Sequence, residues 1–72
     1  MNVKFINGKG DGTIEADSVY LNYQEGFITF VYNDDNKARD FETRVRNLGG
    51  KTKHVDKSFT LTNLSDFTYV FE

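Results

Sequence analysis

The 72-residue chain contains no cysteine, no proline and no tryptophan, and only one histidine. Without cysteine, neither a disulfide framework nor a Cys-type zinc site can stabilise a small core. No apolar run approaches the roughly 20 residues that a helix needs to cross a bilayer. The segment from Met1 to Asp11 also lacks the hydrophobic stretch of a signal peptide, because polar side chains interrupt it. We therefore expect one soluble cytoplasmic domain over residues 1–72, with no membrane partner.

The charge of the chain is small but unevenly distributed. Nine Lys and Arg residues face eleven Asp and Glu residues, which leaves a net charge of −2 at pH 7. Seven of the nine basic residues fall between Lys37 and Lys57, and the remainder of the chain is mostly acidic. The acidic part can face a basic partner, and the basic part can contact phosphate groups.

What the chain has in excess is aromatic residues, with seven Phe and four Tyr making up 15% of the sequence. A domain of this size buries only about 60% of the surface of its unfolded chain. Each large ring can bury roughly 150–250 Å², so the rings help to build a small core. The count nevertheless raises the question of whether one small fold can enclose all of them.

Apolar alternation predicts several strands in the first half of the chain. Residues 3–6 alternate, and Gly8–Gly12 after them is typical of a hairpin loop. Between residues 13 and 23 the alternation changes phase near Asp17, which indicates a bulge or a break in the strand. Residues 27–32 are apolar on both faces, which favours a place at the centre of the sheet.

The apolar period then changes to that of a helix over about residues 36–48. Acidic and Asn side chains before this segment can cap its first turn, and Gly49-Gly50 can end it. Further strand segments follow, so we predict an α+β protein in the order β-β-β-α-β(-β). Its mainly antiparallel sheet of about four or five strands packs on the one helix. The apolar stripe of the predicted helix consists of Ala38, Phe41, Val45 and Leu48.

No motif for catalysis or metal binding is complete in this sequence. Gly50-Lys51-Thr52 imitates the end of a phosphate-binding loop, but a helix rather than a strand precedes it. Asp34-Asp35-Asn36 offers oxygen ligands without the glycine and glutamate spacing of a calcium loop. The only histidine, His54, is predicted to lie at the surface, and no serine sits in a recognisable nucleophile motif. We therefore predict that the chain is not an enzyme and that it uses no metal and no cofactor.

The predicted helix is too small to cover all of the aromatic rings. At 1.5 Å per residue it is about 20 Å long, enough for one face of a few strands. Either the sheet curls around its own rings, or an apolar patch remains exposed as an interaction surface with a polar rim. The candidate partner-binding tyrosines are Tyr20, Tyr23, Tyr32 and Tyr69. The candidate acidic rim consists of Asp17, Glu25, Asp34 and Asp35.

These features predict a small protein-interaction module that binds a host protein or a second copy of itself, as a homodimer. In its short length, acidity and content of Tyr, Asp and Asn, the chain resembles small proteins of phages and mobile elements, which include anti-CRISPR proteins. That resemblance implies an inhibitor that blocks a host enzyme or defence complex. The alternative is a nucleic-acid-binding accessory protein that uses the basic 37–57 segment. Its candidate contacts are Arg44, Arg46, Lys51 and Lys53, where the two arginines are also predicted to pair with Asp40 and Glu42.

Overall fold

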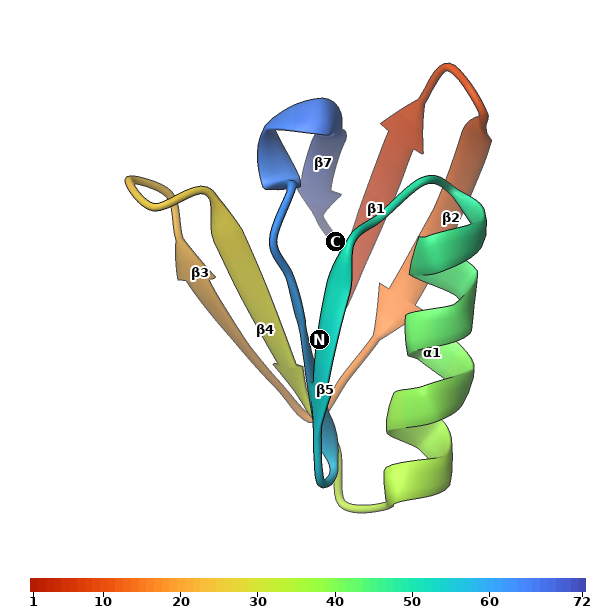
Figure 1. Cartoon of the computed structure of the whole chain (residues 1–72), viewed down its shortest axis with the longest axis vertical. Coiled ribbons are helices and arrows are strands. Elements are labelled where there is room, and N and C mark those ends of the chain that lie inside the picture. The colour runs from red at the N-terminus through yellow and green to blue at the C-terminus, as the bar shows by residue number, and fades with distance from the viewer.

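A computed structural model describes residues 1–72 of the protein and contains seven strands, one α-helix and one short 3₁₀-helix (Figure 1). The α+β class and the mainly antiparallel pairing are confirmed, because every strand pairing is antiparallel. The elements in chain order are β1 (Asn2–Asn7), β2 (Gly10–Glu15), β3 (Ser18–Asn22), β4 (Phe27–Val31), α1 (Asp35–Asn47), β5 (Thr52–Val55), β6 (Ser58–Leu61), η1 (Leu64–Asp66) and β7 (Thr68–Phe71).

The strands form two sheets, in the orders β2-β1-β7 and β3-β4-β6-β5, instead of the single sheet of about four or five strands expected from the sequence. The phase change near Asp17 is the break between the sheets, since β2 ends at Glu15 and β3 begins at Ser18. Ala16 is buried at this corner, and the N–H of Asp17 donates to the carbonyl of Val31. Figure 1 shows β3 and β4 leaning away from β1 and β2 above this corner, with η1 and β7 between them.

The helix follows its local sequence signals closely, one residue earlier than predicted at each end. Asp34 is the N-cap, and its side chain accepts a hydrogen bond from the N–H of Asn36 at 2.8 Å. At the other end Gly49 adopts a φ of 92°, and the N–H of Gly50 donates to the carbonyl of Val45. This is the glycine-terminated geometry that satisfies the last carbonyls of a helix. Neither helix of the protein combines the length and apolar character required to cross a membrane.

The core lies between the inner faces of the two sheets and the helix. Three phenylalanines form its centre, with Phe5 meeting Phe30 edge to face and Phe30 stacked on Phe59 at 5.0 Å. The helix contributes the predicted stripe, although only two of its members are fully enclosed. Leu21 is 42% exposed, because β3 is an edge strand with no cover on that side. The buried residues are Val3, Phe5, Ile14, Ala16, Ile28, Phe30, Tyr32, Ala38, Val45, Phe59, Leu61, Leu64 and Phe67.

Candidate functional site

The two sheets have four edge strands, and the protein treats the two pairs of edges differently. Helix α1 packs against β2, β5 and β6, so it closes the gap between the edges β2 and β5 (Figure 1). We call this side the covered seam. The other two edges, β3 and β7, pair with no further strand, and α1 packs elsewhere, against β2, β5 and β6. We call this side, made of β3, the turn at residues 23–26, η1 and β7, the open seam.

Polar contacts of Asp35 fasten the helix at the covered seam. The carboxylate accepts hydrogen bonds from the backbone N–H of Lys57 and from Nε of Arg39, both at 2.8 Å. Its other contact is Nε2 of His54, also at 2.8 Å. The backbone hydrogen bond from Lys57, followed by that from Arg39, lowers the pKa of Asp35 from 3.8 to about 2. Asp35 therefore ties the first turn of α1 to the β5–β6 hairpin as a charged group.

Two further hydrogen bonds hold the rest of the helix. The hydroxyl of Thr52 on β5 donates to Glu42 at 2.7 Å, and the side-chain amide of Asn7 donates to the carbonyl of Leu48. His54 is engaged in this same fastening, while the hydroxyl of Ser58 donates to the carbonyl of Val55. The hydrogen-bond partner of His54 is therefore Asp35 rather than a serine, and no group of three or more Asp, Glu and His side chains is arranged to hold a metal ion.

The open seam exposes side chains that point toward the core side of their sheets. Leu21 on β3 lies opposite Ile28, and Phe71 on β7 lies opposite Val3. Directly opposed residues of an antiparallel pair share one face of the sheet. Both central-strand partners are fully buried, yet Leu21 remains 42% exposed and Phe71 44% exposed. The inner face is therefore left without cover where it reaches the two edges.

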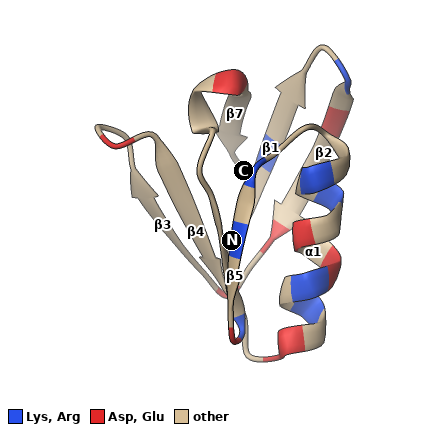
Figure 2. Cartoon of the chain, viewed as in Figure 1, with Lys and Arg blue, Asp and Glu red and all other residues tan.

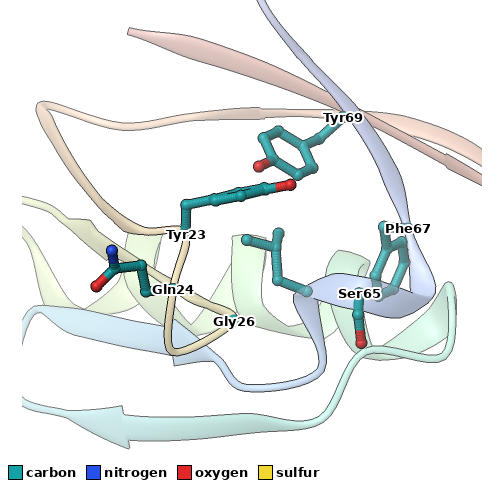
Figure 3. A pocket seen from close by; sticks show the side chains of 7 residues that line it. Tyr23, Gln24, Gly26, Ser65, Phe67 and Tyr69 are labelled. Atoms are coloured by element: carbon teal, nitrogen blue, oxygen red, sulfur yellow. The ribbon is translucent and has the colours of Figure 1, made fainter.

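A groove of about 480 Å³ opens between the β3–β4 turn and η1–β7. Figure 3 shows the rings of Tyr23 and Tyr69 turned toward each other across it, with Phe67 farther along the wall. Tyr69 rests on the buried ring of Phe5, whereas Tyr23 projects from the turn and is 77% exposed. One backbone hydrogen bond joins the two sides, from the N–H of Leu64 to the carbonyl of Gly26 at 3.2 Å. The lining residues are Tyr23, Gln24, Gly26, Leu64, Ser65, Phe67 and Tyr69.

The charge around the open seam has one sign. No Lys or Arg occurs from Gly10 to Asn36 or from Ser58 to Glu72, and these two segments contain β3, β4, η1 and β7. Glu25 lies in the turn beside the groove, and Asp66 lies in η1. In Figure 2 the β3–β4 turn and η1 carry acidic residues only, whereas α1 carries both signs and β5 is basic. The apolar groove is therefore bordered by acids, and the basic residues lie mainly on the covered side.

The four candidate tyrosines separate into three places. Tyr23 and Tyr69 meet at the groove, as a shared surface requires. Tyr20 is exposed but lies opposite Thr29, on the outer face of the four-stranded sheet. Tyr32 is 5% exposed, so its assignment to a partner-binding surface is wrong.

Tyr32 is buried because it belongs to the inner face of the central strand region, together with Phe30. Its ring stacks between Phe41 of the helix, at 5.6 Å, and Phe59, at 6.1 Å. Its hydroxyl is enclosed without a hydrogen-bond partner. Burial raises the pKa of this hydroxyl, and the nearby carboxylates of Asp17 and Glu15 raise it further. Tyr32 is thus a core residue with one polar atom left unsatisfied.

The candidate acids do not form one continuous rim. Glu25 borders the groove, but Asp34 caps the helix and Asp35 fastens it. Asp17 accepts a hydrogen bond from the backbone N–H of Asn33 at the opposite end of β3 from the groove. Asp66 was not among the acidic residues predicted from the sequence, yet it lies between the groove residues Ser65 and Phe67.

The basic candidates are divided between two elements. Lys53 follows Thr52 on β5, and the hydroxyl of Thr52 reaches the helix, so strand alternation turns Lys53 to the other face. Lys51 directly precedes this strand. Arg44 and Arg46 lie in the last turn of α1, where the guanidinium of Arg44 stands 4.8 Å from the centre of the Phe41 ring. The four basic residues therefore do not share one face.

The expected i,i+4 ion pairs on the helix are not formed either. Arg44 engages Phe41 rather than Asp40, and Glu42 accepts from Thr52 rather than pairing with Arg46. The i,i+4 pair that does form joins Arg39 to Asp35 at 2.8 Å.

Sequence reasoning missed several residues of the open seam. Leu64 and Phe67 were not predicted as site residues, because polar Ser65 and Asp66 separate them. Two apolar residues three positions apart are nevertheless a usable signal of one helical turn. Leu21 and Phe71 were missed as seam residues because their exposure depends on which strands are edges.

Comparisons with protein-family models, with curated proteins and with solved structures found no match to this chain.

Proposed function

We propose that this chain is a small non-enzymatic protein-interaction module that docks on its partner through the open seam. The observation that carries the proposal is the groove between Tyr23 and Tyr69, together with the exposed inner-face residues Leu21 and Phe71. Apolar surface of this kind gains free energy when a partner removes it from water. Tyrosine is also enriched in interface cores, because it offers a large ring and remains compatible with water.

The proposed partner presents a basic surface around an apolar protrusion. Acidic residues border the groove, and no Lys or Arg lies in the segments that build it. Complementary charge at the rim speeds encounter and discriminates against acidic competitors. On the other side, the four basic candidates do not share one face, which disfavours nucleic-acid binding there. At the open seam, the acidic charge disfavours nucleic-acid binding. It also disfavours a homodimer in which two open seams face each other.

We further propose that binding is inhibitory, with the chain occupying a working surface of a host enzyme or defence complex in the manner of small phage and mobile-element proteins. A chain of 72 residues with one apolar groove suits stoichiometric blocking. If the partner is an enzyme, its activity should fall linearly with added chain until the two are equimolar.

Photo-crosslinking in a lysate of the chain's native host tests the proposal. A photoreactive phenylalanine analogue replaces Tyr23 in one variant and Val55 in a control, which is also exposed but lies on β5 at the covered seam. We expect one specific protein, with a basic contact surface, to be captured from position 23 and not from position 55. Equal capture at both positions, or capture at neither, would contradict docking through the open seam.

A further inference from the structure

The two seams differ in how their edge strands are protected. Natural sheets discourage unwanted pairing at an edge with charged side chains, proline, bulges or a covering element. At the covered seam, β2 contains Asp11 and Glu15, β5 contains Lys53, and the helix lies beside both. At the open seam, β3 reads Ser-Val-Tyr-Leu-Asn and β7 reads Thr-Tyr-Val-Phe, with no charge and no proline. The exposed edges are thus the ones without protection.

The backbone of β3 is available for a further strand. It pairs only with β4, from Ser18 opposite Val31 to Asn22 opposite Phe27. In an antiparallel pair, alternate N–H and C=O groups of an edge strand point away from the sheet and are left to water. Each face beside this edge also carries one exposed large side chain, Tyr20 on the outer face and Leu21 on the inner face.

We propose that the open seam binds an extended segment of its partner protein by strand addition to β3. This inference rests on the proposed function and names how the partner engages the surface. Main-chain hydrogen bonds to β3 supply affinity, and alternate apolar side chains of the segment enter the seam beside Leu21. Lys or Arg residues at the ends of the segment approach Asp17 and Glu25, which stand just before and just after β3.

A second copy of the chain fits this edge less well. Antiparallel pairing of β3 with itself, centred on Tyr20, would set Asp17 of each copy opposite the Tyr23–Glu25 turn of the other. The contact would therefore bring acidic residues together without a Lys or Arg to offset them. β7 is the other unprotected edge, but it offers four residues against the five of β3.

The test uses phage-displayed random peptides of about eight residues, selected on the full chain. We expect the selected peptides to alternate apolar and polar residues and to contain Lys or Arg. Synthetic versions of one selected peptide are then N-methylated at one residue at a time. Methylation should weaken binding about tenfold or more at every second residue and little at the residues between, because only alternate N–H groups reach β3.

Matched variants of the chain locate the binding edge. The Tyr23→Ala variant should bind the selected peptide more weakly than the unmodified chain does. The Val55→Ala variant, altered at the covered seam, should bind it with unchanged affinity. A selection without binders, or an N-methyl scan without a two-residue period, would overturn strand addition. An increase in mass with chain concentration would overturn it in favour of a second copy. The crosslinking from position 23 tests the docking surface itself, so docking can stand when strand addition fails, and failure of the docking proposal is seen separately.

Discussion

Each of the two seams is a gap between an edge strand of one sheet and an edge strand of the other. Helix α1 fills the gap at the covered seam, and no element fills it at the open seam. At the covered seam, Ala38 and Val45 of the helix fill the gap, and hydrogen bonds from Thr52, Asn7 and Lys57 fasten it. At the open seam, one backbone hydrogen bond crosses the gap beside a groove of about 480 Å³. The single α-helix closes one side of the two sheets, and the other side keeps its aromatic surface exposed.

The largest effect is expected from disturbing the covered seam at Gly50. A Cβ at this position would lie 2.8 Å from Cδ1 of Leu61 and would overlap the side chain of Val45, both of which are fully buried. We expect Gly50→Ala to lower the free energy of unfolding by about 2–3 kcal/mol, as overpacking does in tight cores. Urea unfolding followed by circular dichroism measures this.

Gly8→Ala is the matched control, because a Cβ at Gly8 meets nothing within 4 Å. Its free energy of unfolding should change by less than about 0.5 kcal/mol. Equal losses in the two variants would show that the packing of the helix on β6 is not what makes Gly50 necessary.

A smaller effect, on binding rather than stability, is expected at the open seam. Tyr23 is 77% exposed, so Tyr23→Ala should change the free energy of unfolding by less than about 0.5 kcal/mol. The same substitution should weaken partner binding about tenfold or more, as truncation of an aromatic interface residue does. Calorimetric titration with the captured partner measures the affinity, with Val55→Ala as the variant that leaves it unchanged. An unaltered affinity in Tyr23→Ala would remove the difference between the seams.

The pH dependence of stability should report the fastening of the helix. Asp35 has its pKa lowered from 3.8 to about 2 by hydrogen bonds from Lys57 and Arg39. A carboxyl lowered in the folded state adds stability above its unfolded pKa and loses it as the pH falls through the folded value. The free energy of unfolding should therefore decrease between about pH 4 and pH 2, and Asp35→Asn should flatten this part of the profile. The control is Asp56→Asn, at an exposed residue of the β5–β6 hairpin to which Asp35 is bonded. Its free energy of unfolding should depend on pH as that of the unmodified chain does.

The smallest effect is expected from Tyr32→Phe. This change removes a buried hydroxyl that has no hydrogen-bond partner and keeps the ring stacked between Phe41 and Phe59. We expect a free energy of unfolding that is unchanged or higher by up to about 1 kcal/mol, and an unchanged affinity for the partner. Thermal unfolding and the same titration check both. A loss of affinity would return Tyr32 to the docking surface.

The parts of the fold that were predictable are those specified by neighbouring residues. The helix was found because its apolar stripe, the Asp34 cap and the Gly49-Gly50 ending all occur within one short segment. The break between the sheets was visible as a change of phase near Asp17. That change does not say that β3 leaves one sheet for another, because pairing between distant strands is a property of the whole chain.

The candidate site was less predictable for the same reason. The segment 27–32 is apolar on both faces, so the sequence alone does not decide whether Tyr32 or its neighbours face the core. The exposure of Leu21 and the meeting of Tyr23 with Tyr69 depend on β3 and β7 being edges. What composition did predict was the excess of rings over the cover that one helix supplies, and that excess is found at the open seam.

Hydrogen–deuterium exchange of the chain with and without its captured partner tests the central claim most directly. The account predicts slower exchange on binding in β3, the turn at residues 23–26, η1 and β7, with α1 and β5 unchanged. Protection confined to α1 and β5, with the open seam exchanging as in the free chain, would contradict it.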